Sequence, residues 1–77
     1  MRSNVDQERL IRFGKQLAGV RKSLGITQEE LSHKSGLSLS QIARIETGAI
    51  NTTLNTIFII SDALEIKVVE LFNRDND

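Results

Sequence analysis

The sequence predicts a single small all-α domain of five helices. Apolar residues recur at helical spacing along the first third of the chain, and two short segments further on each begin with a capping motif and end at a glycine. The 77 residues contain no proline, so nothing interrupts a helix anywhere in the chain. No repeat or linker divides residues 1–77, and a chain of this length forms one domain with a modest core.

The first helix is expected over residues 5–23. A stripe of apolar side chains at three- and four-residue steps marks its buried face. The stripe consists of Leu10, Phe13, Leu17, Val20 and Leu24. Gly25 then ends the helix, because glycine tolerates the left-handed conformation at a helix C-terminus.

Two short capped helices follow, over residues 27–35 and 38–47. The Thr27 hydroxyl can accept from the Glu30 amide while the Glu30 carboxylate reaches back to Thr27, which is a capping box. Ser38 and Gln41 repeat this pattern at the start of the next helix.

Glycines end both short helices, at Gly36 and Gly48. Their apolar residues, which we expect in the core, are Leu31, Ile42 and Ile45. Two such helices joined by about three residues, with a glycine in the joint, form a helix-turn-helix over residues 27–47.

Two further helices, over residues 53–65 and 68–73, complete the expected fold. Thr53 caps the first, whose stripe consists of Leu54, Ile57, Ile60, Ala63 and Leu64, and the second supplies Val68, Leu71 and Phe72. Phe58, Ile59 and Ile60 widen the apolar face of the fourth helix beyond the needs of one small core. This excess is either a partner surface or ordinary exposed apolar surface.

The charges are divided unevenly along a chain of zero net charge. Residues 1–46 carry eight Lys and Arg against five Asp and Glu, and residues 47–77 carry two against five. The first part is therefore +3 and the second −3, which predicts a cationic face and an acidic end.

Several function classes are disfavoured by composition. The chain has no cysteine and one histidine, His33, so we expect neither a disulfide nor a metal site. It has no glycine-rich phosphate loop and no paired-histidine metalloprotease motif, so we expect no cofactor and no enzymatic activity. The apolar runs are far shorter than a membrane span and the N-terminus lacks a signal-peptide core, so the expected location is the cytoplasm, away from a membrane.

The stretch from Gly25 to Gly48, GITQEELSHKSGLSLSQIARIETG, resembles the Cro/repressor-type helix-turn-helix family, also called the xenobiotic-response-element family. The positions that match are Phe13-Gly14, Leu17, Arg21, Thr27-Gln28, Leu31, Gly36, Ser40, Ile42, Arg44-Ile45-Glu46 and Gly48. The later segment TLNTIFIISDALEIKVVELF is similar to the family's fourth and fifth helices. Ser32, Ile59 and Lys67 depart from the family pattern, but none lies at a DNA-facing position of the motif.

The resemblance implies a five-helix domain of the lambda-repressor type that binds double-stranded DNA. Within this domain we expect residues 66–77 to form a dimerisation region and tail. Stand-alone chains of this size resemble Cro-like regulators and restriction-modification controller proteins. Two alternatives stay open: an antitoxin-type regulator with a protein partner, and a helical protein-interaction module that does not read DNA, which the zero net charge favours. The resemblance does not decide whether RNA polymerase or a toxin is such a partner.

The residues expected to contact bases lie on the third helix. A B-DNA major groove admits one helix, whose N-terminal residues reach base edges. Because Ile42 and Ile45 face the core, the opposite face carries Leu39, Ser40, Ala43 and Arg44. Arg44 can give two hydrogen bonds to guanine, and Leu39 can pack on a thymine methyl group. The alternatives are that Arg44 is only a solvated surface residue and that Leu39 belongs to the core.

Phosphate contacts are expected beside the third helix. The resemblance implies that Thr27 and Gln28 meet phosphate, in keeping with the preference of helix N-termini for anions. Gln41 points sideways toward a phosphate, and Asn51 and Thr52 are further candidates in the loop after the motif.

The resemblance also implies a buried ion pair between Arg21 and Glu46, which would join the first and third helices and orient the recognition helix.

A homodimer is expected because one helix-turn-helix contacts too few base pairs to specify an operator. Two half-sites about one DNA turn apart require an interface that leaves the second and third helices free. The apolar surplus near the C-terminus predicts this interface at Ile59, Ile66, Val69 and Phe72. For Phe58 the alternative is that it is buried within the protomer instead of at the interface.

Overall fold

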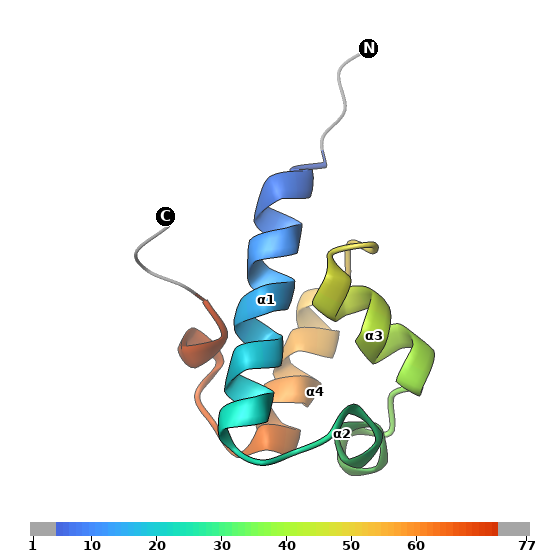
Figure 1. Ribbon diagram of the computed structural model, residues 1–77, viewed down its shortest axis with the longest axis vertical. Coiled ribbons are helices and arrows are strands. Elements are labelled where there is room, and N and C mark those ends of the chain that lie inside the picture. Colours follow the sequence, from blue (N-terminus) through green and yellow to red (C-terminus); the bar gives the residue numbers. More distant parts are fainter. Residues whose placement is uncertain (1–4, 73–77) are drawn as a thin grey trace.

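The structure is a computed structural model that describes residues 5–72. These residues form four α-helices and a closing 3-10 turn, with no strand among them. The elements are α1 (Gln7–Ser23), α2 (Gln28–Ser35), α3 (Leu39–Thr47), α4 (Leu54–Leu64) and η1 (Val68–Leu71). Figure 1 shows α1 upright in the middle of the view, α3 beside it, α4 further back, and α2 near the lower end of α3. The predicted all-α class is therefore confirmed.

The prediction of a fifth α-helix is wrong, because the chain after α4 forms only a single turn of 3-10 helix. The amides of Glu70 and Phe72 donate to the carbonyls of Lys67 and Val69, at 2.9 and 3.1 Å. Phe72 then adopts extended backbone with φ −111° and ψ 132°. The segment is too short to form successive α-helical hydrogen bonds, and the adjacent Val68 and Val69 are β-branched. Residue 73, the expected end of this helix, lies outside the described residues.

Side-chain caps decide where the helices begin. The Asp6 carboxylate accepts from the Arg9 amide at 3.0 Å, so α1 begins at Gln7, two residues later than expected. In α2 the predicted capping box is complete: the Glu30 amide donates to the Thr27 hydroxyl, and the Thr27 amide donates to the Glu30 carboxylate.

The second predicted capping box is only half formed. The Ser38 hydroxyl accepts from the Gln41 amide at 3.1 Å, which starts α3 at Leu39. In the described part of the chain the Gln41 side chain does not return a hydrogen bond to Ser38, and in this the prediction is wrong. Gly36 and Gly48 end α2 and α3 in the left-handed conformation, with φ 77° and 76°.

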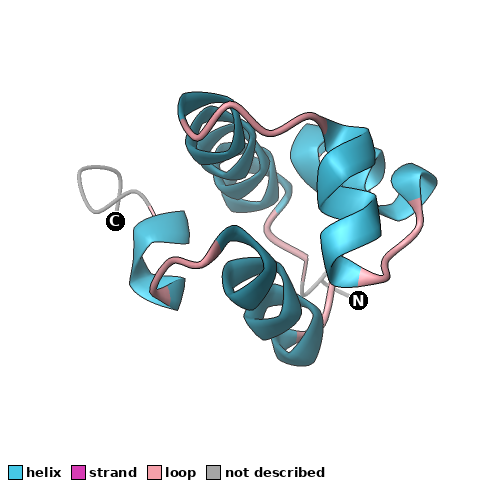
Figure 2. Cartoon of the chain, turned by 90° about the horizontal axis from the view of Figure 1, so that it is seen from below, coloured by secondary structure: helices cyan, strands magenta, loops and turns pink. Residues whose placement is uncertain are grey.

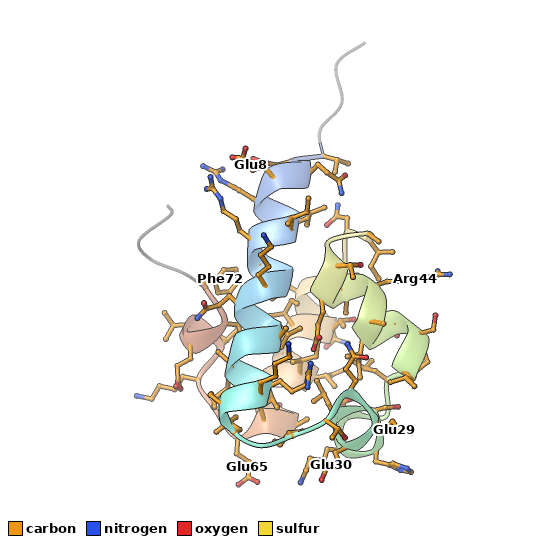
Figure 3. All side chains as sticks on the ribbon, in the orientation of Figure 1. Glu8, Glu29, Glu30, Arg44, Glu65 and Phe72 are labelled. Carbon is orange, nitrogen blue, oxygen red and sulfur yellow. The ribbon has the colours of Figure 1, made fainter. Side chains whose placement is uncertain are left out.

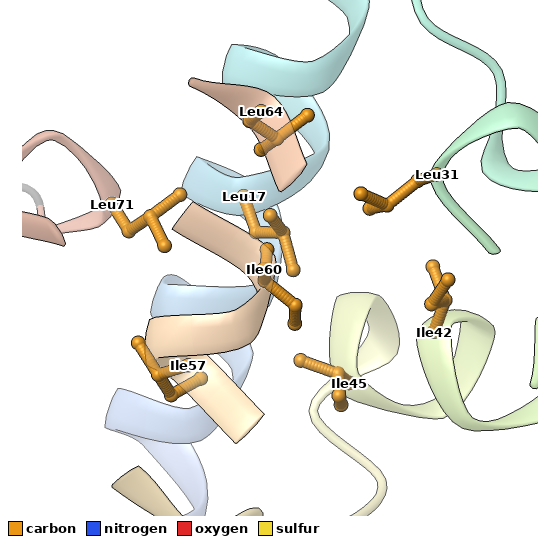
Figure 4. Packing of buried hydrophobic residues seen from close by; sticks show 8 residues of the cluster. All are labelled: Leu17, Leu31, Ile42, Ile45, Ile57, Ile60, Leu64 and Leu71. Atoms are coloured by element: carbon orange, nitrogen blue, oxygen red, sulfur yellow. The ribbon is translucent and has the colours of Figure 1, made fainter. Parts of the chain in front are cut away.

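The core lies where the four helices and η1 meet. Figure 2 shows the helices arranged around this centre, and Figure 4 shows the buried apolar side chains that fill it. These side chains are Leu17, Leu31, Ile42, Ile45, Ile57, Ile60, Leu64 and Leu71. Each of the five elements contributes at least one of them, and α3 packs mainly against α1 and α2.

A glycine brings α1 directly onto the end of α3. A Cβ atom added at Gly14 would lie 2.4 Å from the carbonyl oxygen of Glu46 and 2.5 Å from that of Ile45. Any other residue would therefore push α1 away from α3. This close approach fixes the position of the third helix from its C-terminal end.

Candidate nucleic-acid interface

The residues expected to read bases share one exposed face of α3. Ile42 and Ile45 are buried, and Ser40 and Arg44 on the other side of the helix are exposed. Leu39 is 43% exposed, so the alternative that it belongs to the core is wrong. Ala43 is half-buried on the same face and leaves room for a close approach. Figure 3 shows the Arg44 side chain extending from α3 away from the domain.

The start of α2 combines backbone donors with acidic side chains. The Thr27 side chain and amide are both engaged in the capping box with Glu30. The amides of Gln28 and Glu29 have no helical carbonyl partners, because they are the first of the helix. Hydrogen bonds from Thr27 lower the pKa of the Glu30 carboxyl below its ordinary value. The ionised carboxylate of Glu30 and the exposed Glu29 both reduce the positive potential at this helix end.

The other expected phosphate contacts surround α3. Gln41 is half-buried on α3 itself. Asn51 is exposed and Thr52 half-buried in the loop between α3 and α4. In Figure 1 this loop and α2 lie toward opposite ends of α3. The polar groups proposed for the DNA backbone therefore lie on both sides of the face that carries Arg44.

A buried ion pair joins α1 to α3. Arg21 Nε donates to Glu46 Oε2 at 2.6 Å and Arg21 Nη2 donates to Glu46 Oε1 at 3.0 Å. Arg21 Nη1 donates to the Ile26 carbonyl oxygen at 2.8 Å. The two residues are 6% and 8% exposed. The hydrogen bonds with Glu46 raise the pKa of Arg21, against the opposing effect of burial.

Sequence reasoning missed a third member of this cluster. Gln28, expected only as a phosphate contact, is half-buried, and its Nε2 donates to Glu46 Oε1 at 2.8 Å. These residues are 18 positions apart, so no local pattern relates them. The motif match at Gln28 indicated a role for the residue but not this partner.

Three of the four residues expected at a dimer interface lie together. Ile66, Val69 and Phe72 line a groove of about 390 Å³ between η1 and the C-terminal half of α1, where Val20 and Leu24 form the other wall. Val69 is 54% exposed and Phe72 43% exposed, whereas Ile66 packs partly on the core. The Phe72 ring lies against that of Phe13, with centroids 5.1 Å apart.

The apolar surplus on α4 does not join this groove. Ile59 is half-buried on α4 and is not one of the residues lining the groove. Phe58 is 49% exposed, so the alternative that it is buried within the protomer is wrong.

Residues 5–72 contain neither a membrane-spanning helix nor a group of metal-binding side chains. None of the helices in this range combines the length and the apolar character that crossing a bilayer requires. The same range holds no group of three or more His, Asp or Glu side chains placed to bind a metal ion.

Comparison with known sequences agrees with this geometry. The helix-turn-helix family HTH_3 matches residues 17–71. The chain is 34% identical over 67 residues to the HTH-type transcriptional regulator y4dJ of Sinorhizobium fredii, covering 87% of this chain and 84% of that protein. It is 33% identical over 64 residues to the cryptic phage CTXphi transcriptional repressor RstR of Vibrio cholerae, covering 83% of this chain and 57% of that protein.

Solved structures show the same fold. The restriction-modification controller protein C.AhdI from Aeromonas hydrophila superposes with a TM-score of 0.79 at 38% identity, over 82% of this chain and 96% of that one. An HTH_3 family transcriptional regulator from Vibrio cholerae superposes with a TM-score of 0.84 at 27% identity, over 95% of this chain and 40% of that one. The chain therefore belongs to the HTH_3 helix-turn-helix family of DNA-binding transcriptional regulators.

Proposed function

We propose that the chain is a transcription regulator that binds double-stranded DNA sequence-specifically, as a homodimer on an operator with two half-sites. The observation that supports this most directly is the exposed face of α3, where Arg44 extends away from the domain beside Leu39 and Ser40. The dimensions of a B-DNA major groove admit such a helix.

Each residue of this face has a distinct role in the proposed complex. Arg44 donates two hydrogen bonds to guanine O6 and N7, which is the commonest base-specific contact of a side chain. Leu39 packs on a thymine methyl group, and Ser40 donates to or accepts from a base edge. Ala43 contributes through its small size, which lets the backbone of α3 approach the bases.

Phosphate contacts then hold α3 in the groove. Thr27, Gln28 and the free amides at the start of α2 lie on one side, and Asn51 and Thr52 lie on the other. Gln41 adds a contact from α3 itself. Because the net charge is zero, we expect weak non-specific affinity, so selective binding depends on base contacts and on doubling the module.

The proposed dimer uses the groove between α1 and η1, with Val69 and Phe72 facing their own copies across a two-fold axis. This placement leaves α2 and α3 free for DNA. The two recognition helices then lie about one DNA turn, roughly 34 Å, apart.

The test is selection of duplexes from a random pool, followed by gel shifts on the selected duplex, on a scrambled duplex and on the DNA upstream of the chain's own coding sequence. Arg44→Ala should weaken binding to the selected duplex by about 1–3 kcal/mol and relax the preference at one base pair of each half-site. Arg44→Lys is the matched control, because it keeps the charge but replaces the rigid planar fork of arginine with a flexible ammonium group.

Arg44→Lys should keep most of the affinity for the scrambled duplex while losing part of the discrimination, because its ammonium holds guanine with less fixed geometry. If Arg44→Ala binds both duplexes as the parent does, α3 is not the reading helix. If the parent selects no duplex from the pool, the proposed function is wrong and a protein-interaction module is favoured.

A further inference from the structure

Gln28 links the beginning of α2 to the end of α3. Its Nε2 donates to Glu46 Oε1 at 2.8 Å, and the same oxygen accepts from Arg21 Nη2 at 3.0 Å. Glu46 Oε2 accepts from Arg21 Nε. One carboxylate on α3 is therefore held by donors from both α1 and α2.

We propose that Gln28 is a positioning residue that sets the orientation of α3 relative to the phosphate-facing end of α2. The part of this inference that concerns DNA rests on the proposed function. Loss of the Gln28 side chain would then reduce discrimination between sequences more than it reduces affinity for DNA in general.

The position of the bond in the two helices supports this role. The turn around Gly36 joins α2 to α3 at the C-terminal end of α2, and Leu31 meets Ile42 in the core (Figure 4). Gln28 is the first residue of α2, about 10 Å from that turn at the rise of an α-helix. Gly14 and Arg21 hold the C-terminal end of α3 to α1, and the bond from Gln28 adds a direct tie between this end of α3 and α2, which restricts the angle between the two helices.

The chemistry of the cluster favours a neutral donor at this position. Arg21 already neutralises Glu46, and both are buried. A lysine in place of Gln28 would add an uncompensated charge beside a neutral buried pair, whereas an amide adds a hydrogen bond without a charge.

The same amide can connect DNA to α3. An amide nitrogen carries two hydrogens, and Glu46 accepts one of those on Gln28. The other hydrogen remains for a phosphate oxygen at the start of α2. A phosphate held there is then connected through Gln28 and Glu46 to the helix that carries Arg44. Base recognition depends on such supporting contacts, because a reading side chain must be held within a fraction of an ångström.

The decisive variant is Gln28→Met, which keeps the length of the side chain and removes its donors. Gln41→Met is the matched control, since Gln41 is also a half-buried glutamine proposed to meet phosphate, and within residues 5–72 its side chain makes no hydrogen bond to another helix. Both variants and the parent are titrated with the selected operator duplex and with a scrambled duplex of equal length.

Gln28→Met should lower the ratio of operator affinity to scrambled affinity by about tenfold, the size of one lost base contact. Gln41→Met should weaken both duplexes by the same factor, as expected for a contact to the DNA backbone alone. If Gln28→Met also weakens both duplexes equally, the inference is overturned and Gln28 is a phosphate contact only.

A second measurement needs no DNA. Backbone amide exchange in α3 is measured in the free protein and normalised to global stability from urea unfolding. Exchange should be at least about threefold faster in Gln28→Met than in Gln41→Met, since α3 loses a tie in the first variant alone. Equal exchange in the two variants overturns the inference. A parent that selects no duplex would refute the proposed function, while amide exchange would still decide whether Gln28 positions α3.

Discussion

Glu46→Ala removes the acceptor on which three side-chain hydrogen bonds of the buried cluster converge. Arg21 donates two of them and Gln28 the third. After the substitution the guanidinium of Arg21 keeps its bond to the Ile26 carbonyl oxygen. Its charge then has no counter-ion, at a residue that is only 6% exposed in the parent. The cost is therefore the free energy of an uncompensated buried charge, together with one unpaired amide.

Breaking a buried pair in this way costs about 3–5 kcal/mol in the free energy of unfolding. A chain of 77 residues has about 4–12 kcal/mol in total, so the variant should be partly unfolded at 37 °C. The midpoint of thermal unfolding should fall by about 12–40 °C, at about 4–8 °C per kcal/mol for a domain of this size. Circular dichroism during heating, with urea unfolding at 25 °C, measures both quantities.

Glu8→Ala is the matched control. Glu8 Oε1 accepts from Arg12 Nη2 at 2.9 Å, but the side chains are 76% and 41% exposed. The same substitution in this surface pair should cost less than about 1 kcal/mol. The double variant Arg21→Met/Glu46→Leu should recover much of the loss, because it removes both charges and fills the space. A Glu46→Ala variant that melts as close to the parent as Glu8→Ala does would refute this reasoning.

Three further predictions concern packing, assembly and pH. Gly14→Ala should lower the free energy of unfolding by at least about 2 kcal/mol, because its Cβ would meet a backbone carbonyl at 2.4 Å. Gly19→Ala, whose Cβ meets nothing within 4 Å, should raise the free energy of unfolding by about 0.5–1 kcal/mol. Urea unfolding measures both variants, and equal effects would contradict the close approach of α1 to α3. Val69→Glu should shift the dimer to monomer and weaken operator binding while leaving helix content unchanged. Sedimentation at micromolar concentrations measures the assembly, and circular dichroism measures the helix content. A parent that stays monomeric, or a variant that dimerises equally well, refutes this interface. Hydrogen bonds from Thr27 lower the pKa of Glu30 in the folded state. The stability that this capping box contributes is therefore present above the ordinary glutamate pKa and is lost as pH falls through the lowered value. An NMR titration midpoint for Glu30 at or above about 4.3 would contradict this.

The order of the first four helices and the exposed face of α3 follow from the sequence alone. A capping box, a glycine in the left-handed conformation and an apolar stripe each involve residues three or four positions apart, and such interactions can be read without knowing the rest of the fold. Ile42 and Ile45 must face the core, so Ser40 and Arg44 had to face outward. The predicted starts of α2 and α4 agree with the structure for this reason, with Thr27 and Thr53 as their caps.

Features that depend on residues far apart in the chain arise only when the helices pack together. The bond from Gln28 to Glu46 and the approach of Gly14 to the Glu46 carbonyl join segments 18 and 32 positions apart. The groove between α1 and η1 likewise exists only because Val20 and Val69 come together in space. The composition of these segments and the spacing of their apolar residues do not indicate which segments pack against each other. Only the packing of α1 against α3 and η1 determines which polar group finds a buried partner and which apolar side chain stays exposed.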